Sequence, residues 1–428
     1  MLQNRSATTV QDASPHSPHD DRRVACSDGS DTHWIMPGSQ DYQRAGLSLF
    51  LVGFATFSLI YCVQPLLPVF SEAFDRSPAE SSLALSLTTG LLAIAVVLAG
   101  AFSQALGRRG VMFASMALAA VCNIAVGLAP NWATILTARA IEGLVLGGVP
   151  AVAMAWLAEE IDPRHLGRAM GLYVAGTAFG GMAGRVGIGL VMEYTSWRAA
   201  MVGLGTLGLV ACLGFLLLLP TSRNFVRRPG LNLRYHLRAW ATSLCSLALL
   251  RLYLIGFVLM SIFIALFNYA SFRLAIAPFS LSHSTISLIF LVYSLGIVSS
   301  SISGYLADQF GRRRLMAFGL SMMLAGVLVT LSTSLPVIIL GIALVTAGFF
   351  IGHSVASGSV GRLAGPHKGH ASSLYLLFYY LGSSAIGSIA GWSWQHGGWM
   401  SVVMLTSGLA VVGLMLVLFS PHSPDGSN

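Results

Sequence analysis

The chain has 428 residues, of which 55% are hydrophobic and only 9% are charged, and its net charge at pH 7 is +8. A soluble globular chain carries about a quarter charged residues, so this composition excludes a soluble domain and favours an integral membrane protein. The positive charge does not indicate nucleic-acid binding, because most arginines fall in short loops between apolar runs, where they set membrane orientation.

Residues 1–43 are rich in Ser, Asp, His and Pro and contain no apolar run, so we expect a disordered tail. Twelve apolar runs follow, each long enough to cross about 30 Å of hydrocarbon at about 1.5 Å per residue. The expected spans are 45–68, 82–104, 111–129, 132–157, 168–192, 199–220, 251–272, 284–307, 314–334, 336–361, 370–394 and 399–420. We therefore predict an all-α membrane protein with a six-helix bundle at 44–220, a basic linker at 221–250, a second six-helix bundle at 251–420 and a short tail at 421–428.

The distribution of Lys and Arg predicts the orientation. If the amino terminus is cytoplasmic, that side carries 19 of these residues and the opposite side only Arg76, Arg198 and Arg273. The positive-inside rule then places both termini in the cytoplasm. We expect a multi-pass membrane protein.

One loop occurs twice, as GAFSQALGRRG from Gly100 and as GYLADQFGRRR from Gly304, 204 residues later. Each copy lies between two apolar runs, so the repeat predicts a duplicated bundle. The loop residues of interest are Gly100, Gln104, Gly107, Arg108, Arg109, Gly304, Asp308, Gly311, Arg312 and Arg313.

This loop resembles the signature G-x-L-x-D-x-x-G-R-[KR] of the major facilitator superfamily, in which it joins helices 2 and 3. The second copy matches it, whereas the first has Gln104 in place of the aspartate and Phe102 in place of the leucine. The resemblance implies two six-helix halves that rock about a central site, with the aspartate pairing arginines at an inward gate. With Gln104 in place of the aspartate, we expect the first gate to lose a charge and to keep only hydrogen bonding. The resemblance includes bacterial inner-membrane transporters, so we expect the protein in the bacterial inner membrane. We interpret the cluster at the inner end of the fourth span, Glu159, Glu160, Asp162 and His165, as gate contacts between the halves, with a membrane-enzyme site as the alternative.

Three charges are predicted to lie inside the membrane. Arg139 and Glu142 share one face of the fourth span, about 10 and 15 Å from its outer end, and Arg185 lies about 10 Å from the outer end of the fifth. Intramembrane charges suggest a functional site, and Arg139 with Gly143 resembles the superfamily element R-x-x-x-G, whose arginine is linked to proton movement. We interpret the three as proton-coupling candidates. The alternatives are a structural Arg139–Glu142 pair and an Arg185 that holds an anionic substrate.

Further polar residues lie within the predicted spans. His353 is a proton-relay candidate because histidine titrates near neutral pH, with a neutral, hydrogen-bonded histidine as the alternative. The first span contains no carboxylate, which departs from exporters of the family. The residues that we predict to line a substrate cavity are Tyr61, Gln64, Asn268, Tyr269, Arg273, Tyr379 and Tyr380.

The fifth span is rich in glycine. Gly167, Gly176, Gly180 and Gly184 resemble the antiporter motif of the superfamily, although Gly181 replaces its proline. Small residues also let helices pack closely in lipid, which is the alternative interpretation. The resemblance favours an exporter over an importer and places the chain with the drug:proton antiporter-like branch.

ATP-driven transport is excluded because the single lysine, Lys368, does not belong to a phosphate-binding loop, and nothing resembles a channel filter. We do not expect an enzyme, because the acidic cluster that one could use is interpreted as a gate. We predict a secondary transporter that works by alternating access and exports a small organic solute against inward protons. The alternative is a facilitator or proton symporter that takes up a small solute, an anion included. We expect a monomer with no cofactor, metal or nucleic acid, whose partners are a small-molecule substrate, protons and the lipid bilayer.

Overall fold

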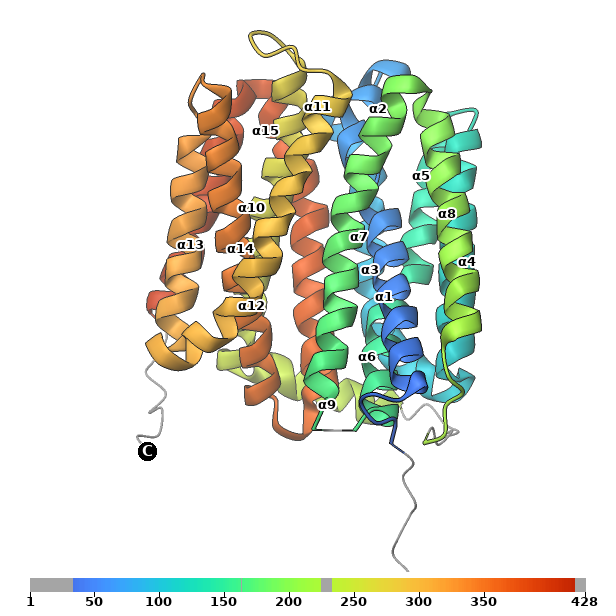
Figure 1. Ribbon diagram of the computed structural model, residues 1–428. Helices are drawn as coiled ribbons and strands as arrows, with labels where there is room; N and C mark the ends of the chain where they lie inside the picture. The colour runs from blue at the N-terminus through green and yellow to red at the C-terminus, as the bar shows by residue number, and fades with distance from the viewer. Residues whose placement is uncertain (1–33, 163, 225–232, 420–428) are drawn as a thin grey trace, which may run out of the picture.

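The structure, a computed structural model, describes residues 34–162, 164–224 and 233–419, without the side chains of residues 100–106, 233 and 366. The predicted all-α architecture is confirmed. Two helical halves stand side by side, the first at the right of Figure 1 and the second at the left. Within the described ranges the only extended pairing is an isolated parallel bridge between Ile35 and Ile161.

The first half contains six membrane-length segments, of which the first and fourth are each broken into shorter helices. Its elements are α1 (Gln40–Tyr61), η1 (Gln64–Leu66), α2 (Leu67–Ala73), α3 (Pro78–Leu106), α4 (Arg108–Leu128), α5 (Trp132–Leu146), α6 (Gly148–Glu160), α7 (Leu166–Tyr194) and α8 (Trp197–Leu218).

Prolines explain both breaks. Proline has no backbone N–H and clashes with the preceding turn of a helix. Pro65 and Pro68 follow the end of α1, where a short 3₁₀ turn intervenes before α2. Pro150 lies four residues after the last residue of α5, Leu146, and the fourth segment changes there into α6.

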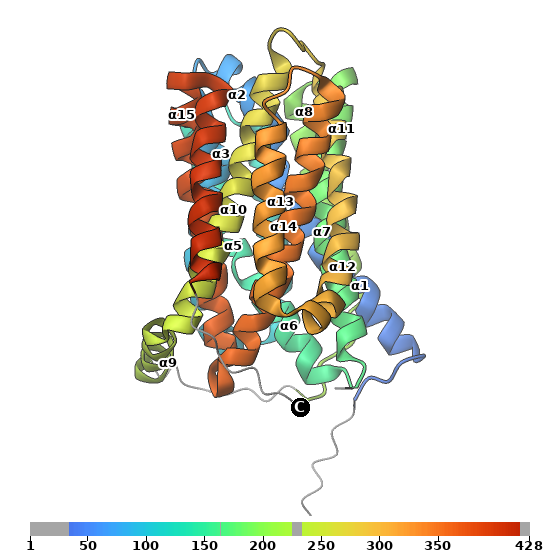
Figure 2. The ribbon, with the colours of Figure 1, turned by 90° about the vertical axis from the view of Figure 1, so that its left-hand side faces the viewer.

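The second half has a similar order. Its elements are α10 (Leu247–Ala275), α11 (His283–Leu288), η2 (Ile289–Val292), α12 (Tyr293–Phe310), α13 (Arg312–Val329), α14 (Leu335–Leu363), η3 (Gly365–His367) and α15 (Lys368–Leu418). Before them α9 (Leu233–Cys245) lies across the direction of the spans (Figures 1 and 2), within the segment that was predicted to be a linker.

In the described part of the chain, ten helices are long and apolar enough to cross a membrane. α15 covers the last two predicted spans, because its backbone leaves helical geometry at Gly397 and Gly398, the latter with φ +57°. The ninth predicted span is α13, whose first residues are three arginines. Each of the twelve predicted spans therefore has a helical counterpart.

The two repeated loops have the same backbone. Gly107 (φ +89°, ψ 136°) joins α3 to α4, and Gly311 (φ +85°, ψ 137°) joins α12 to α13. Only glycine adopts such positive φ values without strain. The agreement supports duplication of a six-helix unit. We call the end of the bundle that carries these two loops the arginine end.

The chain before α1 is partly ordered, which differs from the predicted tail of residues 1–43. Ile35 is buried, with 4% of its surface exposed, and its N–H donates to the carbonyl of Glu160 (2.8 Å). Ser39 caps α1 by accepting from the N–H of Tyr42 (3.1 Å). Burial of Ile35 beneath the first half explains why the order begins before the first span.

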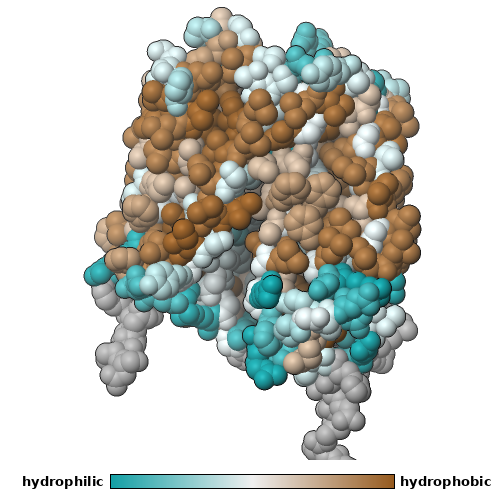
Figure 3. All heavy atoms as spheres, in the orientation of Figure 1, coloured by the Kyte–Doolittle hydropathy of each residue, from teal (hydrophilic) through white to brown (hydrophobic). Residues whose placement is uncertain are grey.

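The halves are joined away from the arginine end. Ser384 of α15 donates to the carbonyl of Ser86 in α3 (2.7 Å), and Ser388 lies 3.0 Å from the Ser86 hydroxyl. On the other flank Gly189 of α7 packs on Ser287 of α11. Figure 3 shows an apolar band across this face of the molecule and a hollow between the halves at the arginine end.

Helices α1 and α7 approach each other through a stripe of glycines. Gly176, Gly180 and Gly184 recur every four residues and lie against Phe50, Phe54 and Ser58, which recur every four residues on α1. The Ser58 hydroxyl donates to the Gly180 carbonyl (2.8 Å). These three glycines therefore serve close packing, whereas a Cβ added at Gly167 would have no such atom within 4 Å.

This packing predicts that Gly180→Ala destabilises the protein. The new methyl group would overlap the carbonyl oxygen of Phe54, which is backbone and cannot move away easily, and overpacking costs about 1–3 kcal/mol. Thermal unfolding of the purified protein measures the loss. Gly187→Ala in the same helix, where no atom lies within 4 Å, is the matched control and should leave the melting temperature unchanged or higher. Equal melting temperatures for the two variants would contradict the packing assignment.

Candidate functional site

Arg139 joins three helices at the centre of the first half. Its guanidinium donates to the carbonyls of Leu59 (3.0 Å) and Ile60 (2.5 Å) in α1, to that of Ala84 (2.9 Å) in α3, and to Glu142. The last carbonyls of a helix have no intrahelical partner, and α1 ends at Tyr61. Arg139 therefore stabilises the end of α1 as well as the buried carboxylate.

Glu142 lies one turn from Arg139 on α5, with its Oε2 2.7 Å from Nη1 of the arginine, and both side chains are completely buried. Its second oxygen, Oε1, has no hydrogen-bond partner among the described residues. A half-satisfied buried carboxylate is costly, and a proton on the free oxygen would lower that cost. The pair can therefore serve either as a structural ion pair or as a proton-binding group.

Arg185 is placed separately from this pair, on the other side of the break after α1. Its Nε donates to Oε1 of Gln64 (2.6 Å), and its Nη1 donates to the carbonyl of Gly181 in its own helix. The rings of Tyr61 and Tyr293 lie 4.4 and 4.6 Å from its guanidinium carbon. Within the described ranges it forms no ion pair with a carboxylate, so it carries an uncompensated charge.

Gln64 connects the two halves. Its amide nitrogen donates to Oδ1 of Asn268 in α10 (2.7 Å). The two residues are 204 positions apart, which is also the offset between Gly107 and Gly311. Gln64 and Asn268 therefore occupy equivalent positions in the duplicated units and meet where the units face each other. Three of the predicted residues, Tyr61, Gln64 and Asn268, are brought together with Arg185.

His353 belongs to an aromatic cluster inside the second half. Its Nδ1 lies 2.9 Å from the hydroxyl of Tyr375, and its ring stacks on Phe349 (centroids 5.7 Å apart) and packs on Tyr379 (4.8 Å). Tyr380 packs edge-on against Tyr379 (5.0 Å). This arrangement corresponds to the hydrogen-bonded alternative for His353, and no carboxylate or arginine of the described chain pairs with its ring.

Two predicted cavity residues lie elsewhere. The Tyr269 hydroxyl donates to the carbonyl of Gly387 in α15 (2.7 Å), where it holds helices together. Arg273 donates to the carbonyls of Thr330 and Ser332 (2.7 Å to the latter), just beyond the end of α13. A cationic side chain at a helix carboxyl end satisfies its free carbonyls. Arg273 therefore caps α13. Its position around the axis of α10 directs its side chain towards α13 and not towards the other predicted cavity residues.

The first arginine loop keeps an ion pair, which corrects the expectation that it retains only hydrogen bonding. Arg108 binds both oxygens of Glu159 at the end of α6 (2.5 and 3.1 Å). In the second loop Arg312 contacts Asp308 (3.4 Å) and Ser359 (3.4 Å). The carboxylate thus comes from the fourth span in one half and from the eighth in the other. Gln104 belongs to the stretch whose side chains lie outside the described part, as does Gly100.

The acidic residues at the end of α6 contact the first half and the start of the linker. Among the described residues they make no hydrogen bond or ion pair with the second half, which corrects the expected gate contacts. Glu160 is buried and accepts from the backbone N–H groups of Arg223 and Asn224 (3.0–3.1 Å). Hydrogen bonds from the Arg164 side chain and backbone hold the pKa of Asp162 down at about 2. Asp162 therefore stays ionised near neutral pH and does not carry a proton there.

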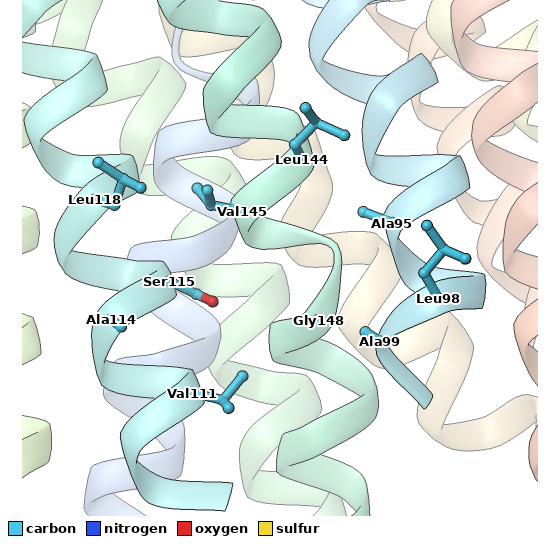
Figure 4. Close-up of a pocket in the computed structure, with 10 residues that line it drawn as sticks. All are labelled: Ala95, Leu98, Ala99, Val111, Ala114, Ser115, Leu118, Leu144, Val145 and Gly148. Carbon is cyan, nitrogen blue, oxygen red and sulfur yellow. The ribbon is translucent and has the colours of Figure 1, made fainter. Parts of the chain in front are cut away.

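A pocket of about 390 Å³ opens between α3, α4 and the break between α5 and α6 (Figure 4). Its wall is almost entirely apolar, and Leu98, Leu118 and Leu144 on its rim are 45–47% exposed. It contains none of the charged residues described above. Its position among spanning helices makes it a lipid-facing groove. The site with chemistry is therefore the charged cluster of Arg139, Glu142 and Arg185 in the first half, which meets the second half through Gln64 and Asn268.

Removing one partner of a buried ion pair costs about 3–5 kcal/mol, because the other charge is left unpaired. Arg139→Met should therefore lower the free energy of unfolding strongly. Arg139→Met with Glu142→Met should lower it less, although the carbonyl hydrogen bonds remain lost. Unfolding of the purified variants measures both, and a double variant no more stable than Arg139→Met alone would contradict the assignment.

Comparison with known proteins agrees with this architecture. The family model of the Major Facilitator Superfamily matches residues 49–276 and 253–428. The chain is 42% identical over 404 residues (92% of this chain, 98% of the relative) to the uncharacterized MFS-type transporter YybF of Bacillus subtilis (strain 168). It is 40% identical over 417 residues (96% and 97%) to the inner membrane transport protein YnfM of Escherichia coli (strain K12). Among solved structures, a mutant of the nucleoside transporter NupG has a TM-score of 0.72 at 13% identity, covering 88% of this chain and 100% of its own. The chain belongs to the major facilitator superfamily and is a multi-pass membrane transporter, not an enzyme.

Proposed function

We propose that the protein exports a small organic solute in exchange for protons, with the two halves rocking to open the central site to each side in turn. The observation that carries the proposal is the fully buried Arg139–Glu142 pair with its unpartnered Oε1. Glu142 binds a proton when a rearrangement of the halves weakens its contact with Arg139, and it releases the proton when the contact re-forms.

The break after α1 supplies a physical connection between proton and solute. Arg139 binds the carbonyls of Leu59 and Ile60 on one side of the break, and Arg185 binds the side chain of Gln64 on the other. A solute that displaces Gln64 from Arg185 shifts the end of α1 and with it the acceptors of Arg139. The glycines of α7 that resemble the antiporter motif support export as the direction of transport.

A second candidate is uptake of a small anionic solute by facilitated diffusion or proton symport. The uncompensated charge on Arg185 favours it, since a charge in low dielectric is stabilised by an opposite charge. The direction of accumulation in membrane vesicles separates the two candidates.

We also propose that the arginine end faces the cytoplasm of a bacterial inner membrane, with both termini on that side. Cys245 of α9 is exposed at this end, whereas Cys62, Cys122 and Cys212 are buried. In a Cys26→Ser background, a membrane-impermeant maleimide should label Cys245 in inverted vesicles at least about tenfold more than in intact cells. His283→Cys, at the opposite end of the bundle and combined with Cys245→Ser, should show the reverse. Labelling of Cys245 from outside intact cells would refute the orientation.

Glu142→Gln tests the coupling. In proteoliposomes with an imposed pH gradient, a panel of radiolabelled organic solutes identifies one that the wild type accumulates. Glu142→Gln should lose at least about 90% of this accumulation, because an amide cannot take up and release the proton. Exchange of the solute without a gradient should continue.

The exposed Glu193 near the end of α7 provides the matched control, and Glu193→Gln should transport as the wild type does. Full gradient-driven accumulation by Glu142→Gln would remove Glu142 from the coupling mechanism. If Glu142→Gln lost both gradient-driven accumulation and exchange, Glu142 would be assigned to the structural role.

A further inference from the structure

We propose that the site around Arg185 binds the carboxylate of a small aromatic monoanion, with the carboxylate on the guanidinium and the ring among the aromatic side chains of the second half. This inference rests on the proposed function as a solute transporter and names the class of solute. It follows from three observations: an uncompensated charge, a set of unused hydrogen-bond donors and an aromatic wall.

The first observation is the charge. Arg185 is 1% exposed, and the described chain places no carboxylate in contact with it. Its partners are the neutral Gln64 and a backbone carbonyl, together with the faces of Tyr61, Phe290 and Tyr293 at 4.4–5.3 Å. Aromatic faces attract a cation but do not neutralise it. The site therefore lacks one negative charge.

The second observation is that the polar groups beside Arg185 have hydrogen-bond donors to spare. Asn268 Nδ2, Ser287 Oγ and Tyr293 Oη are buried and have no partner within the described residues. Asn268 binds Gln64, the ring of Tyr293 lies against the guanidinium, and Ser287 packs on Gly189, one turn beyond Arg185 on α7. An acceptor-only oxyanion can satisfy all three groups, whereas a cation would leave the Asn268 amide N–H groups unpaired.

The geometry distinguishes a carboxylate from a single-atom anion. The guanidinium presents its N–H groups as a planar fork that matches two oxygens at once. One of these N–H groups, Nε, already donates to the amide oxygen of Gln64, at 2.6 Å. A carboxylate that enters as the halves separate replaces this neutral oxygen by a charged one and releases Gln64 from its contact with the other half.

The third observation concerns the rest of the solute. The two rings of the second half that lie against the Arg185 guanidinium, Phe290 and Tyr293, continue into an aromatic wall. Phe267 stacks on Phe290 (5.3 Å), and Phe263 stacks on Phe349 (4.0 Å) and contacts Tyr293 (5.3 Å). Flat rings pack on such faces with about 0.5–1.5 kcal/mol beyond their buried area. A second charge on the solute would have no partner there, which restricts the class to monoanions.

Benzoate is the probe, with benzamide as its neutral isostere and cyclohexanecarboxylate as the non-aromatic acid. Binding to the purified wild type is measured by titration calorimetry at pH 7, without any gradient. We expect benzoate to bind at least tenfold more tightly than benzamide and more tightly than cyclohexanecarboxylate. Arg185→Gln should weaken benzoate binding at least tenfold and leave benzamide unchanged.

Matched variants keep the test decisive. Arg198→Gln removes an arginine that binds the carbonyls of Gly127 and Ala129 outside the site, and it should bind benzoate as the wild type does. Tyr293→Phe and Ser287→Ala each remove one donor and little volume, and each should weaken benzoate binding about threefold or more. If Arg185→Gln does not fold, Arg185→Lys and Tyr293→Phe decide the question.

Equal affinity for benzoate and benzamide, no binding of benzoate, or unchanged binding in the Arg185 and Tyr293 variants would overturn the inference. Stronger binding of cyclohexanecarboxylate would overturn its aromatic part. Failure of the proposed function is distinguishable: benzoate would bind the wild type and Glu142→Gln equally, but a pH gradient would drive no transport of it. Conversely, gradient-driven transport of neutral solutes without benzoate binding would support proton-coupled transport and refute the aromatic monoanion as the solute.

Discussion

The hold of Arg139 on the end of α1 is the interaction on which the rest of the charged network depends. One guanidinium satisfies two carbonyls of α1, one of α3 and the carboxylate of Glu142. Helix ends buried without such partners are costly, so Arg139 stabilises the break that Pro65 and Pro68 introduce after α1. The break in turn directs Gln64 towards Asn268 and Arg185. The glycine stripe that fastens α1 to α7 keeps these positions in register.

The duplicated halves keep the same backbone while their charges diverge. Gly107 and Gly311 have nearly identical dihedral angles, and the second arginine after each of these turns, Arg109 or Arg313, donates to a carbonyl of the last helix of its own half. The acidic partner is not kept in place, since Glu159 serves Arg108 and Asp308 serves Arg312. Geometry at a glycine turn is restrictive, whereas an ion pair at a helix end can be formed from either neighbouring helix. The charged cluster likewise lies in the first half, and the aromatic cluster around His353 occupies the second.

Much of this fold could be predicted from the sequence, because hydrophobic length and arginine-rich loops follow directly from the demands of the bilayer. The spacing of Arg139 and Glu142 predicted that they share a helix face, and they form an ion pair there. The 204-residue offset between the two loops also relates Gln64 to Asn268, so the repeat contained a sequence signal for this contact between the halves. Depth in the membrane could be estimated, but rotation about the helix axis could not, which is why Arg273 was expected in a cavity and is found capping α13. Ser287, Phe290 and Tyr293 gave no signal, since a serine and aromatic rings within an apolar run look like ordinary packing. The partner of Arg108 required tertiary contacts that no local pattern contains.

The segment before α1 has a consequence for the unit that it joins. Ile35 pairs with Ile161, and Asp41 forms an ion pair with Arg223 (3.1 Å), so the chain enters and leaves the first half at one spot. Glu160 anchors the exit by binding two backbone N–H groups there. The segments that lead into and out of the first half thus lie side by side. This arrangement is suited to circular permutation and to synthesis of the two halves as separate polypeptides. What keeps the halves associated is then their contact surface and not the peptide that follows Asn224.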